Sequence, residues 1–192
     1  MISEIFKDIL KNYTVKNHNV VLDNQNIVDR IENDYSKDFN EFISTFGDFN
    51  TEFSCLKGET LLRVPYAVIY SREYDDYNNG LFIGFSVYPD KGYVYLKLDQ
   101  GLVNINGNFN LPFVRGEKLR SNIDDIPKDF EFNKNKCAPG NIIGKTYCID
   151  DLDDSTIIND LNYIISVYND LIPEFDEIIT LSFDDIVDSI DL

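Results

Sequence analysis

Residues 80–98 read GLFIGFSVYPDKGYVYLKL, and this stretch decides the fold class of the chain. Two runs rich in β-branched and aromatic residues flank Pro-Asp-Lys-Gly at 89–92, a pattern typical of an antiparallel hairpin. In the second run, aromatic or basic residues at 93, 95 and 97 alternate with aliphatic residues at 94, 96 and 98. This alternation predicts a strand with one aliphatic face and one aromatic and basic face.

The same reasoning assigns elements on either side of the hairpin. Alternating apolar residues predict further strands at 52–56, at 62–71, around 130–132 and at 142–149. Apolar residues at three- and four-residue spacing predict helices at 2–13, 27–31, 36–46, 111–122 and 155–172. Ser36 is expected to cap the third of these helices, Gly47 to end it, and Pro173 to end the last helix.

Together these elements predict an α+β fold. An antiparallel or mixed central sheet, built as a β-meander, is flanked by N-terminal helices and a long C-terminal helix. The length of 192 residues suits one domain with a small appendage. We therefore expect a domain at residues 1–173 and an acidic C-terminal tail or linker at residues 174–192.

The acidic charge of the chain is unevenly distributed. The sequence has 34 Asp and Glu against 17 Lys and Arg, a formal net charge of −17. Such a chain is a poor generic binder of nucleic acid or anionic membrane. However, residues 146–192 hold 13 acids and no Lys or Arg, so residues 1–145 are nearly balanced. The first 145 residues therefore retain the capacity for a basic surface.

Catalytic and metal-binding residue types are sparse. His18 is the one histidine, and Cys55, Cys137 and Cys148 lack the spacing of a disulfide framework or a zinc site. We therefore expect no catalysis, cofactor or metal. The sequence has neither a signal-peptide pattern nor an apolar run long enough to span a membrane, which favours a cytoplasmic protein without a membrane partner.

Aromatic and basic residues are interleaved in the region of the hairpin. Seven tyrosines lie between positions 66 and 95, among Arg63, Arg72, Lys91 and Lys97. Aromatic planes that stack on bases, next to cations that meet phosphates, are typical of extruded-base or single-strand recognition. The alternative is an ordinary tyrosine-rich sheet face covered by helices.

Four segments of this region and of the later chain resemble the McrB-like N-terminal domain family. They read RVPYAVIY at 63–70, NGLFIGF at 79–85, YVYLKLDQG at 93–101 and GNIIGKTY at 140–147. The resemblance covers roughly residues 1–173. Tyr66 stands where the family has Trp after Pro, and Asp99 stands where it has Asn before Gln-Gly.

The resemblance implies a DNA-recognition module of a modification-dependent restriction system. The best-known type in the family reads methylated cytosine and extrudes the base into an aromatic-lined pocket. By position, Tyr66 and Phe82 would hold the base. Members of the family usually precede an AAA+ GTPase motor or a nuclease, so a partner subunit of either kind is expected here.

We accordingly expect a non-catalytic DNA-binding domain of a restriction or defence system. The candidate residues for DNA or base contact are Tyr66, Phe82, Tyr70, Arg63, Arg72, Lys97, Gln100, Arg115, Lys118 and Arg120. The alternative is an acidic interaction or regulatory protein that mimics phosphate and binds a nuclease or AAA+ partner. A small hydrolase or nuclease is a third possibility.

Overall fold

A computed structural model describes residues 1–16, 19–21, 25–105, 107–131 and 140–190 of the chain. The helices are α1 (Ile2–Asn12), α2 (Gln25–Asp29), the π-helix η2 (Arg30–Tyr35), α3 (Ser36–Ile43), η3 (Tyr77–Asn79), α4 (Leu111–Ser121), η4 (Ile149–Asp151), α5 (Asp154–Ile178) and α6 (Phe183–Ser189). The strands are β1 (Val15–Lys16), β2 (Asn19–Val20), β3 (Phe49–Lys57), β4 (Thr60–Ser71), β5 (Leu81–Tyr88), β6 (Tyr93–Gln100) and β7 (Ile143–Cys148).

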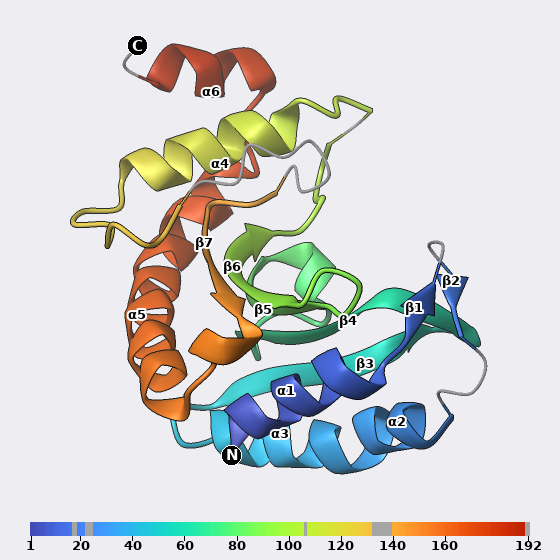
Figure 1. The fold of residues 1–192 in the computed structure, drawn as a ribbon. Coiled ribbons are helices and arrows are strands. Elements are labelled where there is room, and N and C mark those ends of the chain that lie inside the picture. Colours follow the sequence, from blue (N-terminus) through green and yellow to red (C-terminus); the bar gives the residue numbers. More distant parts are fainter. Residues whose placement is uncertain (17–18, 22–24, 106, 132–139, 191–192) are drawn as a thin grey trace. The chain divides into compact units, whose positions relative to one another are not determined.

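The main sheet confirms the predicted α+β fold. Its five strands follow the order β3-β4-β5-β6-β7, so each strand neighbours the next one in the chain (Figure 1). The amides of Gln100 and Ile142 bond the carbonyls of Gly140 and Leu98, the pattern of an antiparallel pair at the β6–β7 edge. The sheet is therefore an antiparallel meander, and β1 with β2 forms a separate two-stranded sheet.

The chain divides into two compact units. Unit 1 comprises residues 1–69, 84–96 and 146–162, and unit 2 comprises residues 70–83, 97–145 and 163–192. The division passes through β4, β5, β6, β7 and α5. Each unit is described separately below.

Unit 1 has an aromatic core. Phe6 of α1 lies 4.9 Å from Phe85 of β5 between ring centroids, and Phe39 of α3 lies 5.4 Å from Phe53 of β3. All four rings are buried. Their tilted and edge-on geometries are the ones that aromatic pairs favour, and they fix both helices on the sheet.

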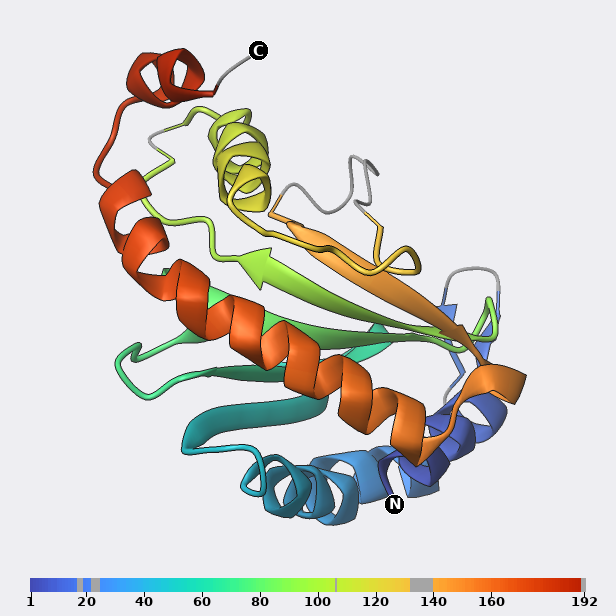
Figure 2. The same ribbon diagram turned by 90° about the vertical axis from the view of Figure 1, so that its left-hand side faces the viewer.

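Unit 2 has a core of aliphatic and aromatic side chains, to which α4, α6 and the C-terminal half of α5 contribute. Figure 2 shows α4 and α6 side by side near the end of α5. Ser182 and Asp185 form a capping box that begins α6, and Ile186 of this helix is fully buried. Phe175 of α5 is fully buried as well.

Two predicted helix ends are wrong. Ser36 does not cap a helix, because α2, η2 and α3 follow one another from Gln25 to Ile43 and Ser36, the first residue of α3, itself has helical dihedral angles. The helical run buries Ile31 and Phe39 on either side of Ser36, and this burial outweighs the capping preference of a serine. The same helix ends at Ile43, before Gly47.

Pro173 does not end the last helix. It lies inside α5, which continues to Ile178 because Phe175 and Ile178 are buried. Burial of these side chains offsets the backbone hydrogen bond that proline cannot make. The boundary expected at residue 173 therefore falls within a helix, and the segment after it forms the end of α5 and α6.

The strand expected around 130–132 is reduced to one bridge. Glu131 pairs with Gly144 of β7 in an isolated antiparallel bridge. Phe132 and Cys137 lie outside the described residues, and so does His18.

Candidate nucleic-acid interface

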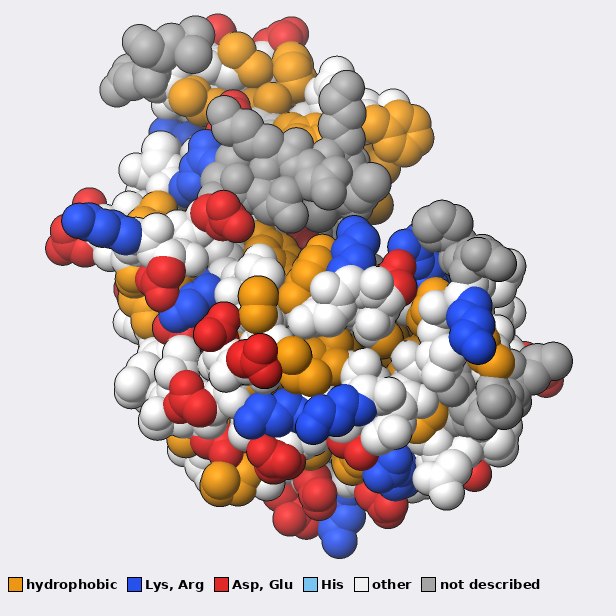
Figure 3. Space-filling view, in the orientation of Figure 1, with side chains coloured by type: hydrophobic (Ala, Val, Ile, Leu, Met, Phe, Trp, Pro, Cys, Tyr) orange, Lys and Arg blue, Asp and Glu red, His pale blue; other side chains and the backbone are white. Residues whose placement is uncertain are grey.

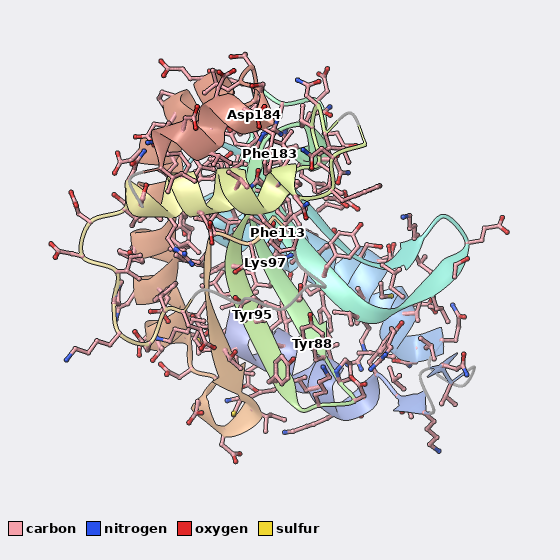
Figure 4. All side chains as sticks on the ribbon, turned by 90° about the horizontal axis from the view of Figure 1, so that it is seen from above. Tyr88, Tyr95, Lys97, Phe113, Phe183 and Asp184 are labelled. Atoms are coloured by element: carbon pink, nitrogen blue, oxygen red, sulfur yellow. The ribbon has the colours of Figure 1, made fainter. Side chains whose placement is uncertain are left out.

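Five residues of unit 2 bring aromatic rings, a cation and an anion together. We call Tyr70, Tyr77, Phe82, Lys97 and Asp99 the aromatic–lysine group. The ring of Tyr77 lies 6.1 Å from that of Tyr70 and 5.2 Å from that of Phe82 between centroids. The Lys97 ammonium lies 5.5 Å from the centroid of Phe82 (Figure 4 labels Lys97). Three strands and one short helix supply these side chains.

A tight turn places Tyr77 over Phe82. The Asp76 carboxylate accepts a hydrogen bond from the Asn78 amide, which begins η3 and turns the chain back toward β5. Gly80 is required after this turn, because a Cβ atom there would lie 2.3 Å from the ring of Tyr74. Tyr77 is one of the seven tyrosines of this region, but it is not among the residues expected from the sequence to contact DNA. Tyr77 lies three residues before Gly80, and this spacing could have indicated a turn that places its ring near Phe82.

Lys97 is paired with a carboxylate. Its ammonium lies 2.5 Å from the Asp99 carboxylate, and the two side chains are 18% and 7% exposed. The other Asp99 oxygen accepts from the Gln100 amide. Asp99 therefore compensates the charge of Lys97, which leaves the pair suited to a neutral polar group such as a base edge more than to a phosphate.

Three segments of the family resemblance meet at this group. The Gly101 amide donates to the Gly80 carbonyl at 2.8 Å, and the Gln100 amide donates to the Gly140 carbonyl at 3.2 Å. A Cβ atom on Gly101 would lie 1.9 Å from the Asn78 carbonyl oxygen, and one on Gly140 would lie 2.3 Å from the Asp99 carboxylate. Glycine is therefore needed at both positions for the close approach of the backbones.

Gln100 and Arg115 are buried, which corrects the expectation that they contact DNA. Gln100 is 3% exposed, and its side-chain amide donates to the Pro112 carbonyl at 3.0 Å. Arg115 has no exposed surface, and its guanidinium donates to the carbonyls of Val103 and Ile179. Burial lowers the pKa of Arg115. Both residues hold backbone segments in place, and neither reaches a phosphate.

The other cations of α4 also take part in packing. The Lys118 ammonium donates to the Ser189 carbonyl at the end of α6 at 2.9 Å. Arg120 is half-buried, and burial lowers its pKa. The predicted basic cluster on α4 thus supplies less exposed charge than the sequence indicates. Arg72, which follows β4, is exposed.

Two candidate residues belong to unit 1, where each meets a carboxylate. The Tyr66 hydroxyl donates to the Glu52 carboxylate, and the Arg63 guanidinium lies 2.5 Å from the Asp90 carboxylate. In the same unit, the rings of Tyr88 and Tyr93 pack against each other with centroids 4.7 Å apart. The Lys91 ammonium lies 5.2 Å from the centroid of the Tyr88 ring (Figure 4 labels Tyr88). This second group of tyrosines and lysine offers a matched control for the aromatic–lysine group.

The described parts of the chain offer no metal centre and no membrane span. Within those ranges, no three His, Cys, Asp or Glu side chains are placed to hold a metal ion. None of the helices in the same ranges is long and apolar enough to cross a membrane.

Comparison with protein-family models, with curated proteins and with solved structures gives no match. The resemblance to the McrB-like N-terminal domain family therefore rests on the four quoted segments.

Proposed function

We propose that the chain is a DNA-recognition module of a modification-dependent restriction or defence system. The aromatic–lysine group of unit 2 contacts a base, and catalysis resides in a partner subunit with AAA+ GTPase or nuclease activity. The observation that supports this proposal is the convergence of the segments around Gly80, Gly101 and Gly140 at Phe82, Lys97 and Asp99. Those are the segments on which the resemblance depends.

The chemistry of the group favours a base as the ligand. Tyr70 and Tyr77 are half-buried and offer ring surface to a planar base, and such stacking contributes about 1–3 kcal/mol per base. Phe82 is 8% exposed and packs edge to face against Tyr77, so it supports that ring from the core. The Asp99 carboxylate accepts hydrogen bonds, as the amino group of cytosine requires, and the Lys97 ammonium donates them. A cytosine edge presents both kinds of group.

The charge distribution limits the phosphate contacts. Residues 97–145 have eight Lys and Arg against six Asp and Glu, whereas residues 146–192 have only acids. Several of the eight are engaged in packing, as Arg115 and Lys118 are. We therefore expect binding to be weak, to require low salt, and to depend on the base more than on the backbone.

Titration of labelled DNA duplexes with the full chain at low salt tests the proposal. Fluorescence anisotropy would compare a duplex with central 5-methylcytosine, the same duplex without it, and a single strand of the same sequence. We expect saturable binding with a preference for one of the three DNAs. Folded protein that binds none of them would contradict the proposal.

A further inference from the structure

Exposed apolar side chains gather at one end of unit 2. Phe109 is 75% exposed, Leu102 is 53% exposed and Leu181 is 40% exposed. They lie in the segment between β6 and α4 and in the connection between α5 and α6. Figure 3 shows hydrophobic side chains over α6 and the segment before α4, at the top of the view. Large apolar residues exposed in one region mark an interaction surface more often than scattered ones do.

A buried arginine holds these segments together. The Arg115 guanidinium donates to the Val103 carbonyl at 2.5 Å and to the Ile179 carbonyl at 3.4 Å. Val103 directly follows Leu102, and Ile179 lies two residues before Leu181. Leu102 and Leu181 therefore lie in two backbone segments that hydrogen bonds of Arg115 hold together. This part of the surface is thus ordered before any partner binds.

Carboxylates border the same surface. The exposed acids of α6 and of the end of α5 are Asp176, Glu177, Asp184, Asp185 and Asp188. Asp185 takes part in the capping box and Asp176 accepts from Tyr74. Asp184 and Asp188 lie four residues apart on α6, a spacing at which like charges repel. The ion pairs formed between described residues include none of these five carboxylates.

We propose that this surface, formed by Leu102, Phe109, Leu181 and the carboxylates of α6, binds a basic amphipathic segment of a partner protein. Apolar residues of the segment would cover Phe109 and the leucines, and its Lys or Arg would meet Asp184 and Asp188. A basic segment is expected because its charge complements the carboxylates of α6. The uniformly acidic 146–192 region repels both a phosphate backbone and a second copy of itself.

This surface uses none of the aromatic–lysine group, so the inference goes beyond DNA binding and does not depend on it. The test therefore measures peptide binding in the absence of DNA. A negative result would contradict this inference without bearing on the proposed DNA binding.

A synthetic amphipathic helix of leucine and lysine is the probe, and a leucine–glutamate helix of the same length is its control. The isotope-labelled full chain is titrated with each peptide by NMR, and affinities are measured by calorimetry. We expect the leucine–lysine peptide to shift amide signals of residues 101–105, 107–109 and 179–189. The leucine–glutamate peptide should produce no shifts.

Variants show whether the named side chains cause the binding. Phe109→Ser should lower the affinity for the leucine–lysine peptide by about tenfold, which is the range for loss of an aromatic anchor at an interface. The double variant Asp184→Asn and Asp188→Asn should weaken it by at least about threefold and remove part of its salt dependence. Ile158→Ser is the matched control, because Ile158 is an exposed apolar residue of unit 1 at 37% exposure and should leave affinity unchanged. All of these side chains are exposed, so the variants should fold.

Three results would overturn the proposal. The first is an affinity for the leucine–lysine peptide that Phe109→Ser leaves unaffected. The second is equal binding of the leucine–glutamate peptide, which would show that charge plays no part. The third is self-association of the chain that Phe109→Ser abolishes, which would identify a second copy as the occupant.

Discussion

The Arg115 guanidinium is the largest buried polar group of unit 2, and it donates to two backbone carbonyls from different segments. Substitution by Met keeps most of the apolar volume but leaves both carbonyls without their donor. We expect Arg115→Met to lower the free energy of unfolding by about 2–3 kcal/mol, the range for hydrogen bonds to a charged group. Chemical denaturation followed by circular dichroism measures this change.

Lys118→Met on the same helix is the control for Arg115. Lys118 is half-exposed and makes one hydrogen bond to the end of α6, so its loss should cost less than about 1 kcal/mol. If Arg115→Met kept full stability but lost DNA affinity, Arg115 would be a DNA contact after all.

Tyr168 makes the stability of unit 2 sensitive to alkaline pH. Its fully buried hydroxyl accepts from the Ser71 amide at 2.6 Å, and burial raises its pKa to about 12. The folded state therefore disfavours the phenolate that the unfolded chain forms near pH 10. The contribution of Tyr168 is fully present below pH 10 and is lost as the pH rises toward about 12.

Replacement of Tyr168 by Phe isolates this effect. The variant loses some stability at neutral pH because the Ser71 amide loses its acceptor. Its stability should then fall less steeply than that of the original chain above pH 10. Urea denaturation at a series of alkaline pH values compares the two slopes. Parallel curves would mean that ionisation of other groups causes the alkaline loss.

At the scale of elements, α5 contains a proline that its packing tolerates. Pro173 has no N–H for the carbonyl of Asn169, one turn earlier. Replacement by Ala should restore that bond and raise the free energy of unfolding by about 1–2 kcal/mol, after allowance for the more flexible unfolded chain. Thermal and urea denaturation measure the gain.

The exposed Ser166, on the same helix, provides the comparison for Pro173. Ser166→Ala should change stability by less than about 0.5 kcal/mol, because it alters helix propensity alone. A loss of stability in Pro173→Ala would show that α5 needs the proline, for instance to set its path toward α6.

Local patterns predicted the strands well and the helix ends poorly. The hairpin of β5 and β6 follows from alternation and a turn within one short stretch, so its elements lie close to where they were expected. Ser36 and Pro173 are ordinary helix boundaries by local preference. Burial of Phe39 in the first case and of Phe175 in the second overrides that preference, and burial depends on contacts distant in the sequence.

The candidate site was predictable in part, for a similar reason. Tyr70, Phe82 and Lys97 are all candidates from the sequence, and neighbouring strands of a meander bring them together. Tyr66, which was expected to hold the base with Phe82, belongs to unit 1 and is not part of this group. Gln100 and Arg115 were mistaken for surface residues, because polarity is visible in a sequence whereas burial is not. The division of the chain into two units was not predicted, because it passes through the interior of predicted strands and of the last predicted helix.

At the scale of the whole molecule, charge and exposed apolar residues are distributed unevenly along the chain. Residues 97–145 carry a slight excess of bases, whereas residues 146–192 are purely acidic. We propose base recognition for the aromatic–lysine group and partner binding for the acidic surface around Phe109. The −17 charge of the chain thus limits DNA affinity without excluding a base-directed contact.

The most direct test of this account is the DNA affinity of Tyr77→Ala compared with that of Tyr88→Ala. Both tyrosines are half-buried, and each packs against another aromatic ring. Fluorescence anisotropy at low salt, with the duplex or strand that the original chain prefers, gives both affinities for variants shown to be folded. We predict that Tyr77→Ala weakens binding by about tenfold, the loss of one base-stacking ring, and that Tyr88→Ala leaves it within about twofold. Equal affinities of the two variants would contradict base recognition by the aromatic–lysine group.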